Sequence, residues 1–136
     1  MKRDMDLIRK ILFYIEENYV AGQGAISISI EGYTDGEIFE HCQLAYQDGL
    51  IQKPLNSSTL LDGSSCMVNN LTSAGYDFLD KIREDTIWNK TKTIMKQKGL
   101  PMVTGTIKAI ATAIITAMAE GVTNSILKNG GQIDAD

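Results

Sequence analysis

Apolar residues near the start of the chain recur every three or four positions. The stripe consists of Met5, Ile8, Leu12, Ile15 and Tyr19, and it is widened by Leu7 and Ile11. This spacing places side chains on one face of an α-helix. Gly22 and Gly24 follow as breaking residues. We therefore predict a helix over about residues 3–19, with one face in the core.

Residues 25–30 alternate between apolar and polar side chains, which indicates a half-buried strand. A capping-box pattern, Thr34-x-x-Glu37, comes next and predicts the start of a second helix. Gly49 is suited to end that helix, because glycine readily adopts the left-handed conformation after a helix C-terminus. The inner stripe of this helix is expected at Ile38, Cys42 and Ala45.

Two further short strands are predicted around a polar stretch at residues 56–65. One covers Leu50 and Ile51, and the other covers residues 66–71, so that together they would form a β-hairpin. Thr72 can cap the helix that follows. The order helix, strand, helix, β-hairpin, helix predicts an α+β fold, a winged-helix-like domain over residues 1–85.

The remaining chain is predicted to be helical. From Thr86 onward one face carries Trp88, Thr91 and Met95, and Gly99 and Pro101 then interrupt the pattern. A final helix is expected over about residues 103–127. We predict a helical C-terminal extension over residues 86–128 and a mobile polar tail over residues 129–136.

The final helix is apolar around most of its circumference, which normally means burial. One stripe runs through Ile107, Ile110, Ile114, Ala117 and Gly121, and another through Ala111, Ile115, Met118, Val122 and Ile126. A domain of this size has little room to cover both stripes, so we predict that one is buried against a second copy. The alternative is packing against its own domain. The candidate oligomerisation residues are Ile107, Ile110, Ile114, Ile115, Met118 and Val122.

Charge is distributed unevenly over a chain whose net charge is −4. Residues 1–80 hold 5 basic and 12 acidic residues, whereas residues 81–136 hold 8 basic and 5 acidic ones. Residues 34–48 hold no Lys or Arg, although this is the helix that would enter the major groove, and phosphate contacts rely on basic side chains. We predict instead a protein-partner surface at Asp35, Glu37, Glu40 and Asp48.

The one basic cluster, near Trp88, consists of Lys90, Lys92, Lys96 and Lys98. It has two interpretations: an ordinary solvated helix face, or an electrostatic footprint for nucleic acid or for an acidic surface. The acidic surface of a second copy would be one such target.

Candidate chemistry is sparse. The chain has two cysteines, Cys42 and Cys66, and no secretory leader pattern, so we expect reduced core thiols in the cytoplasm. His41 and Cys42 are adjacent and would point about 100° apart on a helix, which disfavours a zinc site and leaves His41 exposed beside a core cysteine. An enzyme would need His41 to meet Ser64 or Cys66 in a pocket. We predict no enzyme activity, metal or cofactor.

No membrane-spanning segment is predicted. The charge-free run between Lys108 and Glu120 is 11 residues long, whereas a bilayer crossing needs roughly 20 apolar residues.

Several stretches resemble the uncharacterised domain-of-unknown-function family 2513. They are residues 1–12 (MKRDMDLIRKIL), 30–33 (IEGY), 48–51 (DGLI), 71–83 (LTxxGxxFLDxIR, where x is any residue) and 85–92 (DTIWNKTK), with Lys98-Gly99 after them. The resemblance implies a winged-helix-like fold and a phage or mobile-element setting, without catalytic or ligand residues to carry over. It ends near Gly99, before the final helix.

These observations favour a non-catalytic regulatory module that acts by protein–protein binding, as a homo-oligomer and with an unidentified protein. The alternative is a winged-helix DNA-binding transcriptional regulator. Such a regulator would use the lysine cluster or other basic side chains, namely Lys2, Arg3, Arg9, Lys10 and Lys53.

Overall fold

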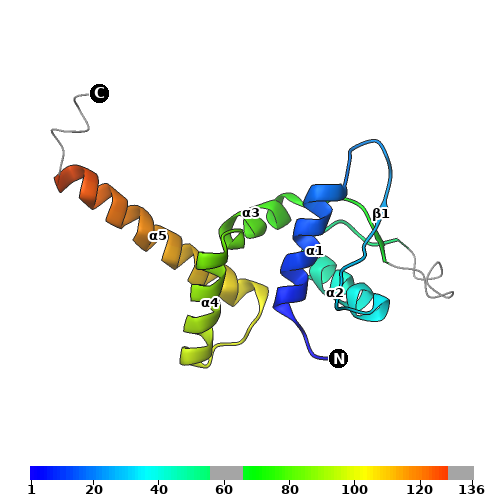
Figure 1. Cartoon of the computed structure of the whole chain (residues 1–136), viewed down its shortest axis with the longest axis horizontal. Helices are drawn as coiled ribbons and strands as arrows, with labels where there is room; N and C mark the ends of the chain where they lie inside the picture. The colour runs from blue at the N-terminus through cyan, green and yellow to red at the C-terminus, as the bar shows by residue number, and fades with distance from the viewer. Residues whose placement is uncertain (56–65, 129–136) are drawn as a thin grey trace. The chain divides into compact units, whose positions relative to one another are not determined.

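A computed structural model describes residues 1–55 and 66–128 (Figure 1). Two compact units, Met1–Asp80 and Lys81–Asp136, make up the chain and are treated separately below. The predicted hairpin tip at 56–65 and the predicted mobile tail at 129–136 lie outside the described residues. The elements are α1 (Met5–Asn18), β1 (Ile26–Ser27), α2 (Asp35–Gln47), β2 (Met67–Val68), α3 (Ser73–Ile82), α4 (Asp85–Lys98) and α5 (Thr104–Lys128).

Helix α1 forms where the apolar periodicity predicted it. The side chain of Asp4 accepts a hydrogen bond from the backbone N–H of Leu7 at 3.2 Å, which satisfies one of the unpaired donors of the first turn. The predicted stripe faces the core, except that Tyr19 is the half-buried C-terminal cap. The buried residues of α1 are Met5, Leu7, Ile8, Ile11, Leu12 and Ile15.

Helix α2 has the capping box expected from its sequence. The Thr34 hydroxyl accepts from the backbone N–H of Glu37 at 3.1 Å, and the Glu37 carboxylate accepts from the backbone N–H of Thr34 at 3.0 Å. The helix closes at Gly49, whose φ of 77° is left-handed. The backbone N–H of Leu50 then donates to the carbonyl of Ala45 at 2.9 Å. Helices α1 and α2 contact each other, and Ile38, Cys42 and Ala45 are buried as predicted.

The sheet of the first unit is small. Strands β1 and β2 pair antiparallel, with Ile26 opposite Val68. The alternation predicted for residues 25–30 is present in the burial, because Ile28 is buried while Ser27 and Ser29 are exposed. Hydrogen-bonded strand geometry, however, covers only two of these residues.

The predicted winged-helix-like α+β fold with its β-hairpin is wrong. The described residues form five helices and one two-stranded sheet, so the fold is dominated by helices. The two predicted hairpin segments share one isolated bridge, between Ile51 and Leu71, and three backbone hydrogen bonds between residues 50–55 and 67–72. The backbone N–H of Leu50 is already used to close α2, and Pro54 has no N–H to donate. A continuous ladder between these segments therefore does not form.

Helix α3 begins directly against the end of α2. Thr72 caps it as predicted, because its hydroxyl accepts from the backbone N–H of Gly75 at 2.9 Å. The backbone N–H of Thr72 donates to the carbonyl of Leu50 at 3.0 Å. The same Leu50 carbonyl lies so close to Gly75 that a β-carbon there would overlap it. Phe78 on α3 is buried.

The second unit is built on the contact between α4 and α5. On α4 the buried positions are Trp88, Thr91 and Met95, which were predicted to share one side. The Thr91 hydroxyl donates to the carbonyl of Ile87 at 2.7 Å, so this buried polar group is satisfied. On α5 the buried positions are Ile107 and Ala111.

Candidate functional site

Helix α5 is much longer than the helix that covers it. It has 25 residues and α4 has 14, which correspond to lengths of about 38 Å and 21 Å at 1.5 Å per residue. Figure 1 shows the C-terminal half of α5, in orange, continuing past α4. Ile107 and Ala111 are fully buried, whereas every described side chain from Thr116 to Leu127 is exposed. Within the described residues of the second unit, the C-terminal half of α5 therefore has no cover.

The exposed half continues the same face that α4 covers in the first half. Eleven residues make slightly more than three helical turns, so positions eleven apart differ by only about 20° around the axis. Met118 therefore lies nearly in line with Ile107, and Val122 lies nearly in line with Ala111. Ile126 follows one turn later. We call Met118, Val122 and Ile126 the α5 stripe; their side chains are 47%, 60% and 40% exposed.

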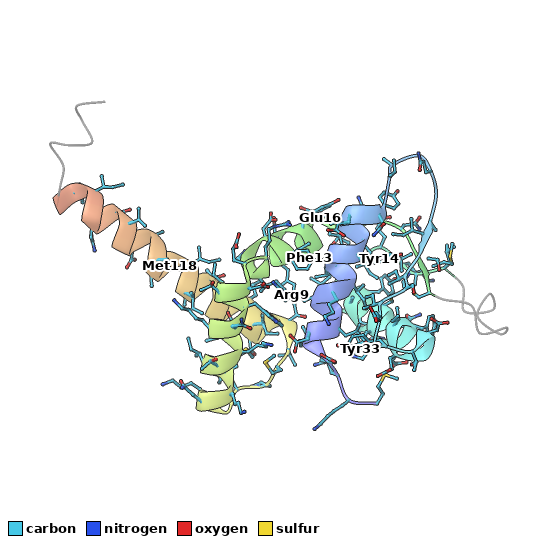
Figure 2. All side chains as sticks on the ribbon, viewed as in Figure 1. Arg9, Phe13, Tyr14, Glu16, Tyr33 and Met118 are labelled. Carbon is cyan, nitrogen blue, oxygen red and sulfur yellow. The ribbon has the colours of Figure 1, made fainter. Side chains whose placement is uncertain are left out.

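Two polar residues of α5, Glu120 and Asn124, lie on the other side of the helix from the α5 stripe. Relative to Val122, Glu120 and Asn124 are each displaced by about 160° around the axis. The stripe itself presents three large apolar side chains in successive turns (Met118 is labelled in Figure 2). An exposed apolar surface of this kind is typical of an association site.

The six candidate oligomerisation residues are divided by this arrangement. Ile107 lies in the core of its own unit, so it is unavailable to a partner. Ile110, Ile114 and Ile115 are half-buried, and Met118 and Val122 are exposed. We predicted that one of the two stripes is buried against a second copy. Within the described residues of the second unit, coverage changes along α5, because α4 is the shorter helix.

A membrane is the other environment that accepts an apolar helix. Residues Thr104–Asn124 are long and apolar enough to cross a bilayer, by length and composition alone. Lys108 and Glu120 lie within this segment, 12 residues apart, or about 18 Å along the axis, whereas the hydrocarbon core is about 30 Å thick. A spanning helix would place at least one of these charges in hydrocarbon at a cost of about 2–4 kcal/mol. The absence of a membrane span remains a prediction.

The four acidic residues proposed as a partner surface do not form one compact patch. Asp35 and Glu37 lie in the first turn of α2, and Asp48 is its C-terminal cap. The 13 positions from Asp35 to Asp48 correspond to about 20 Å along the axis. Glu37 also takes part in the capping box, and hydrogen bonds from the backbone and side chain of Thr34 lower the pKa of its carboxyl. Asp35, Glu40 and Asp48 are exposed, and Glu37 is half-buried.

The lysine cluster is also spread around its helix. At 100° per residue, Lys92 and Lys96 lie about 40° apart, whereas Lys90 lies about 160° from Lys92. The ammonium of Lys92 is 5.5 Å from the centroid of the Trp88 ring. Lys98 lies in the last turn of α4, where its positive charge interacts favourably with the negative end of the helix dipole. The lysines therefore do not line a single surface for phosphates.

Two basic residues of α1 that were candidates for DNA contact lie over aromatic rings. The Arg9 guanidinium is 5.0 Å from the centroid of Phe13 (both are labelled in Figure 2). The Lys10 ammonium is 5.3 Å from the centroid of Tyr33. Tyr33 is half-buried, and its hydroxyl is 3.5 Å from a carboxylate oxygen of Asp4. Burial, and then the charges of Asp4 and Asp6, raise the pKa of the Tyr33 hydroxyl.

His41 was predicted to be exposed, and this is wrong, because the residue is buried. Its Nε2 accepts a hydrogen bond from the backbone N–H of Asp4 at 2.9 Å, and its Nδ1 lies 2.8 Å from the carbonyl of Glu37. Both ring nitrogens are therefore engaged in joining α2 to the start of α1. The spacing of Ile38, His41 and Ala45, by three and then four, would have indicated this burial.

Cys42 and Cys66 are free and buried, as core cysteines were expected to be. Their side chains share a hydrogen bond, in which the Cys42 thiol donates to the Cys66 sulfur; this bond, together with burial, raises the pKa of Cys42. The described residues contain no group of three or more His, Cys, Asp or Glu side chains arranged to hold a metal ion. Ser64, the other residue considered for catalysis, lies outside the described residues.

Comparisons with known proteins agree with the resemblance found in the sequence. Residues 2–101 match the family described as "Hypothetical protein (DUF2513)". A Haemophilus influenzae protein named "Uncharacterized protein" is 37% identical over 118 residues, which cover 87% of this chain and 98% of the relative. That aligned region is long enough to extend beyond the family match into α5. No solved structure matches.

Proposed function

This chain belongs to the DUF2513 family, and we propose that it is a non-catalytic interaction protein that works as a homo-oligomer, with α5 as its association surface. The observation that carries the proposal is the exposure of the α5 stripe. Its three apolar side chains continue a face that is fully buried only three turns earlier. Such a face gains stability from any apolar surface that covers it, by roughly 25 cal/mol for each Å² removed from water.

A second copy of the chain suits this surface better than a bilayer does. The first turns of α5 are packed on α4 through Ile107 and Ala111, and insertion across a membrane would have to separate them. Insertion would also bury Lys108 or Glu120. Pairing of the C-terminal halves leaves both the α4 contact and the two charged residues unchanged. The α5 stripe offers only three large apolar side chains per copy, so we expect a weak association, with a dissociation constant on the order of micromolar.

A non-catalytic role is supported by the burial and hydrogen bonding of the candidate catalytic side chains. His41 has both ring nitrogens engaged in hydrogen bonds within the core. Cys42 and Cys66 are buried against each other, and burial together with their hydrogen bond disfavours the reactive thiolate of Cys42. The exposed acidic side chains of α2 remain our proposal for the surface that binds another protein.

The experiment is sedimentation equilibrium of the full chain over a range of concentrations. We expect the wild type to dimerise and Val122→Glu to stay monomeric, because a carboxylate on the α5 stripe would have to lose its hydration in the contact. Asn124→Glu is the matched control: it adds the same charge to an exposed position about 160° around the helix, and we expect it to dimerise like the wild type. Wild-type protein that is monomeric at all concentrations contradicts the proposal. Co-sedimentation of a monomer with lipid vesicles would identify a membrane as the occupant instead.

A further inference from the structure

We propose that Cys42 and Cys66 form a reversible disulfide in the presence of hydrogen peroxide, so that the core of the first unit holds a redox-modification site. This inference is independent of the proposed oligomer. The two residues are well separated in sequence: Cys42 lies on α2, and Cys66 comes immediately before β2. Both are free and buried, and their sulfur atoms share a hydrogen bond.

Regular backbone structure holds both cysteines where they are. Cys42 is part of the buried face of α2. The carbonyl of Cys66 accepts a hydrogen bond from the backbone N–H of Ile28 at 3.0 Å. The carbonyl of the next residue, Met67, accepts from the backbone N–H of Leu55 at 3.0 Å. The contact between the two sulfurs therefore joins a helix to hydrogen-bonded chain on either side of β2.

The direction of the hydrogen bond assigns a role to each thiol. The Cys42 thiol donates to the Cys66 sulfur, which stabilises negative charge on Cys66 and lowers its pKa. The same bond, together with burial, raises the pKa of Cys42. Because the thiolate is the nucleophile in thiol oxidation, Cys66 is the attacking residue. Cys42 is the resolving residue, an arrangement typical of redox-sensing pairs.

The reaction takes place in two steps that balance. The Cys66 sulfur attacks one oxygen of hydrogen peroxide, an S–O bond forms and the O–O bond breaks, giving a sulfenic acid and one water. The Cys42 sulfur then attacks the Cys66 sulfur, an S–S bond forms and the S–O bond breaks, and the hydroxide leaves with the Cys42 proton as a second water. Two electrons pass from the sulfurs to the peroxide oxygens. A dithiol reductant reverses the change by thiol–disulfide exchange.

Burial favours a small oxidant. The side chains of Cys42 and Cys66 are 0% and 1% exposed. Exchange with a bulky disulfide, such as oxidised glutathione, requires that disulfide to reach a sulfur directly, and the core would have to open to admit it. Hydrogen peroxide is only slightly larger than water, so it is the oxidant to which we assign the site.

A metal ion is the other group that two thiols could hold. Structural zinc takes four ligands, and the described residues contain no group of three or more His, Cys, Asp or Glu side chains arranged for a metal. His41, next to Cys42 in sequence, has both ring nitrogens engaged in hydrogen bonds. Disulfide formation needs only the two sulfurs that the fold brings together.

The test uses the full wild-type chain in its folded state. After treatment with a modest excess of hydrogen peroxide, the chain is unfolded in urea and its remaining thiols are labelled with a maleimide. We expect both thiols to be lost together, without cross-linking of chains on a non-reducing gel. Mass spectrometry of the digested protein should find the peptides of Cys42 and Cys66 joined, and dithiothreitol should restore both thiols.

Serine variants test the two roles. In Cys42→Ser the hydroxyl can still donate to Cys66, but no resolving thiol remains, so a sulfenic acid should accumulate and be trapped by dimedone. In Cys66→Ser we expect the remaining thiol to be lost at least about tenfold more slowly, because no hydrogen bond favours its thiolate. Circular dichroism confirms that each variant is folded.

Three results would overturn the proposal. Two free thiols after peroxide treatment of the folded wild type, with oxidation only in urea, would show that the pair is an inert part of the core. A disulfide between chains would rule out the pairing of Cys42 with Cys66 within one chain. Sulfenic acid in Cys66→Ser but not in Cys42→Ser would overturn Cys66 as the attacking residue.

Discussion

Gly75 at the start of α3 lies directly against the backbone carbonyl of Leu50, which follows the end of α2. A β-carbon at position 75 would overlap the carbonyl oxygen, and that oxygen is held in place because it accepts the backbone N–H of Thr72 at 3.0 Å. We therefore expect Gly75→Ala to lower the free energy of unfolding by about 2–4 kcal/mol in urea denaturation, since backbone must move to admit the methyl group.

Gly36 on α2 is the matched control for this substitution. Its β-carbon would have only the Thr34 hydroxyl nearby, at an ordinary distance of 3.9 Å. Gly36→Ala should therefore leave stability unchanged or raise it by up to about 1 kcal/mol, since alanine is the better helix former. Equal stabilities of Gly75→Ala and Gly36→Ala would show that the α2–α3 contact is looser than described.

The imidazole of His41 makes the second testable contact. In His41→Leu the backbone N–H of Asp4 loses its acceptor, and we expect the free energy of unfolding to fall by about 1–3 kcal/mol. Tyr33→Phe is a useful comparison, because it removes a hydroxyl that lies 3.5 Å from the Asp4 carboxylate. That distance is too long for a strong hydrogen bond, so this loss should be below about 0.5 kcal/mol. An unchanged free energy of unfolding in His41→Leu would mean that the hydrogen bond between His41 and Asp4 does not stabilise the packing of α1 on α2.

Glu37 predicts a specific pH dependence. Hydrogen bonds from Thr34 lower the pKa of its carboxyl in the folded chain, so the ionised form is favoured by folding. Its stabilising contribution is complete above the ordinary glutamate pKa of about 4.3 and is lost as the pH falls through the lower, folded-state value. Gln can still accept the Thr34 N–H but carries no charge. Glu37→Gln should therefore lower the Tm by on the order of 1–3 °C near neutral pH.

The same comparison in acid is the check. Once the pH has fallen below the lowered pKa of the Glu37 carboxyl, the protonated side chain resembles glutamine, so the Tm of Glu37→Gln should converge with that of the wild type. A Tm difference that stays constant from neutral pH to acid would show that the charge contributes nothing, and would assign the effect to packing alone.

Salt separates an apolar association surface from one held by opposite charges. If the α5 stripe carries dimerisation, the dissociation constant should change by less than about threefold between low and moderate salt, because screening acts on charges and not on apolar burial. The double variant Lys92→Glu/Lys96→Glu, which alters the two lysines that share a face of α4, should dimerise like the wild type. Loss of the dimer in this variant, together with weakening by salt, would favour docking of the lysine cluster on the acidic α2 surface. Binding of the wild-type protein to a DNA duplex in low salt would instead favour the alternative of a DNA-binding transcriptional regulator.

The sequence alone was sufficient to predict the helices and their ends. The periodicity of residues 5–15 predicted the buried face of α1, and the Thr34–Glu37 capping box, Gly49 and Thr72 were assigned correctly as helix boundaries. These features depend on residues within four positions of one another, so local chemistry decides them. The apolar character of α5 and its bounds could be predicted for the same reason.

Tertiary structure decided which segments that are distant in sequence contact each other. The strand at Ile26 pairs with Val68, which is distant in sequence. The predicted partner segment around Ile51 keeps only an isolated bridge to Leu71, because the backbone N–H of Leu50 is used to close α2. Burial of His41 likewise depends on the N–H of Asp4, 37 positions away. The α5 stripe is exposed because α4 is shorter than α5 and covers only its first turns. This exposure becomes apparent only when the two helices are packed together. No local pattern encodes such relationships, because each is set by which segments meet in space.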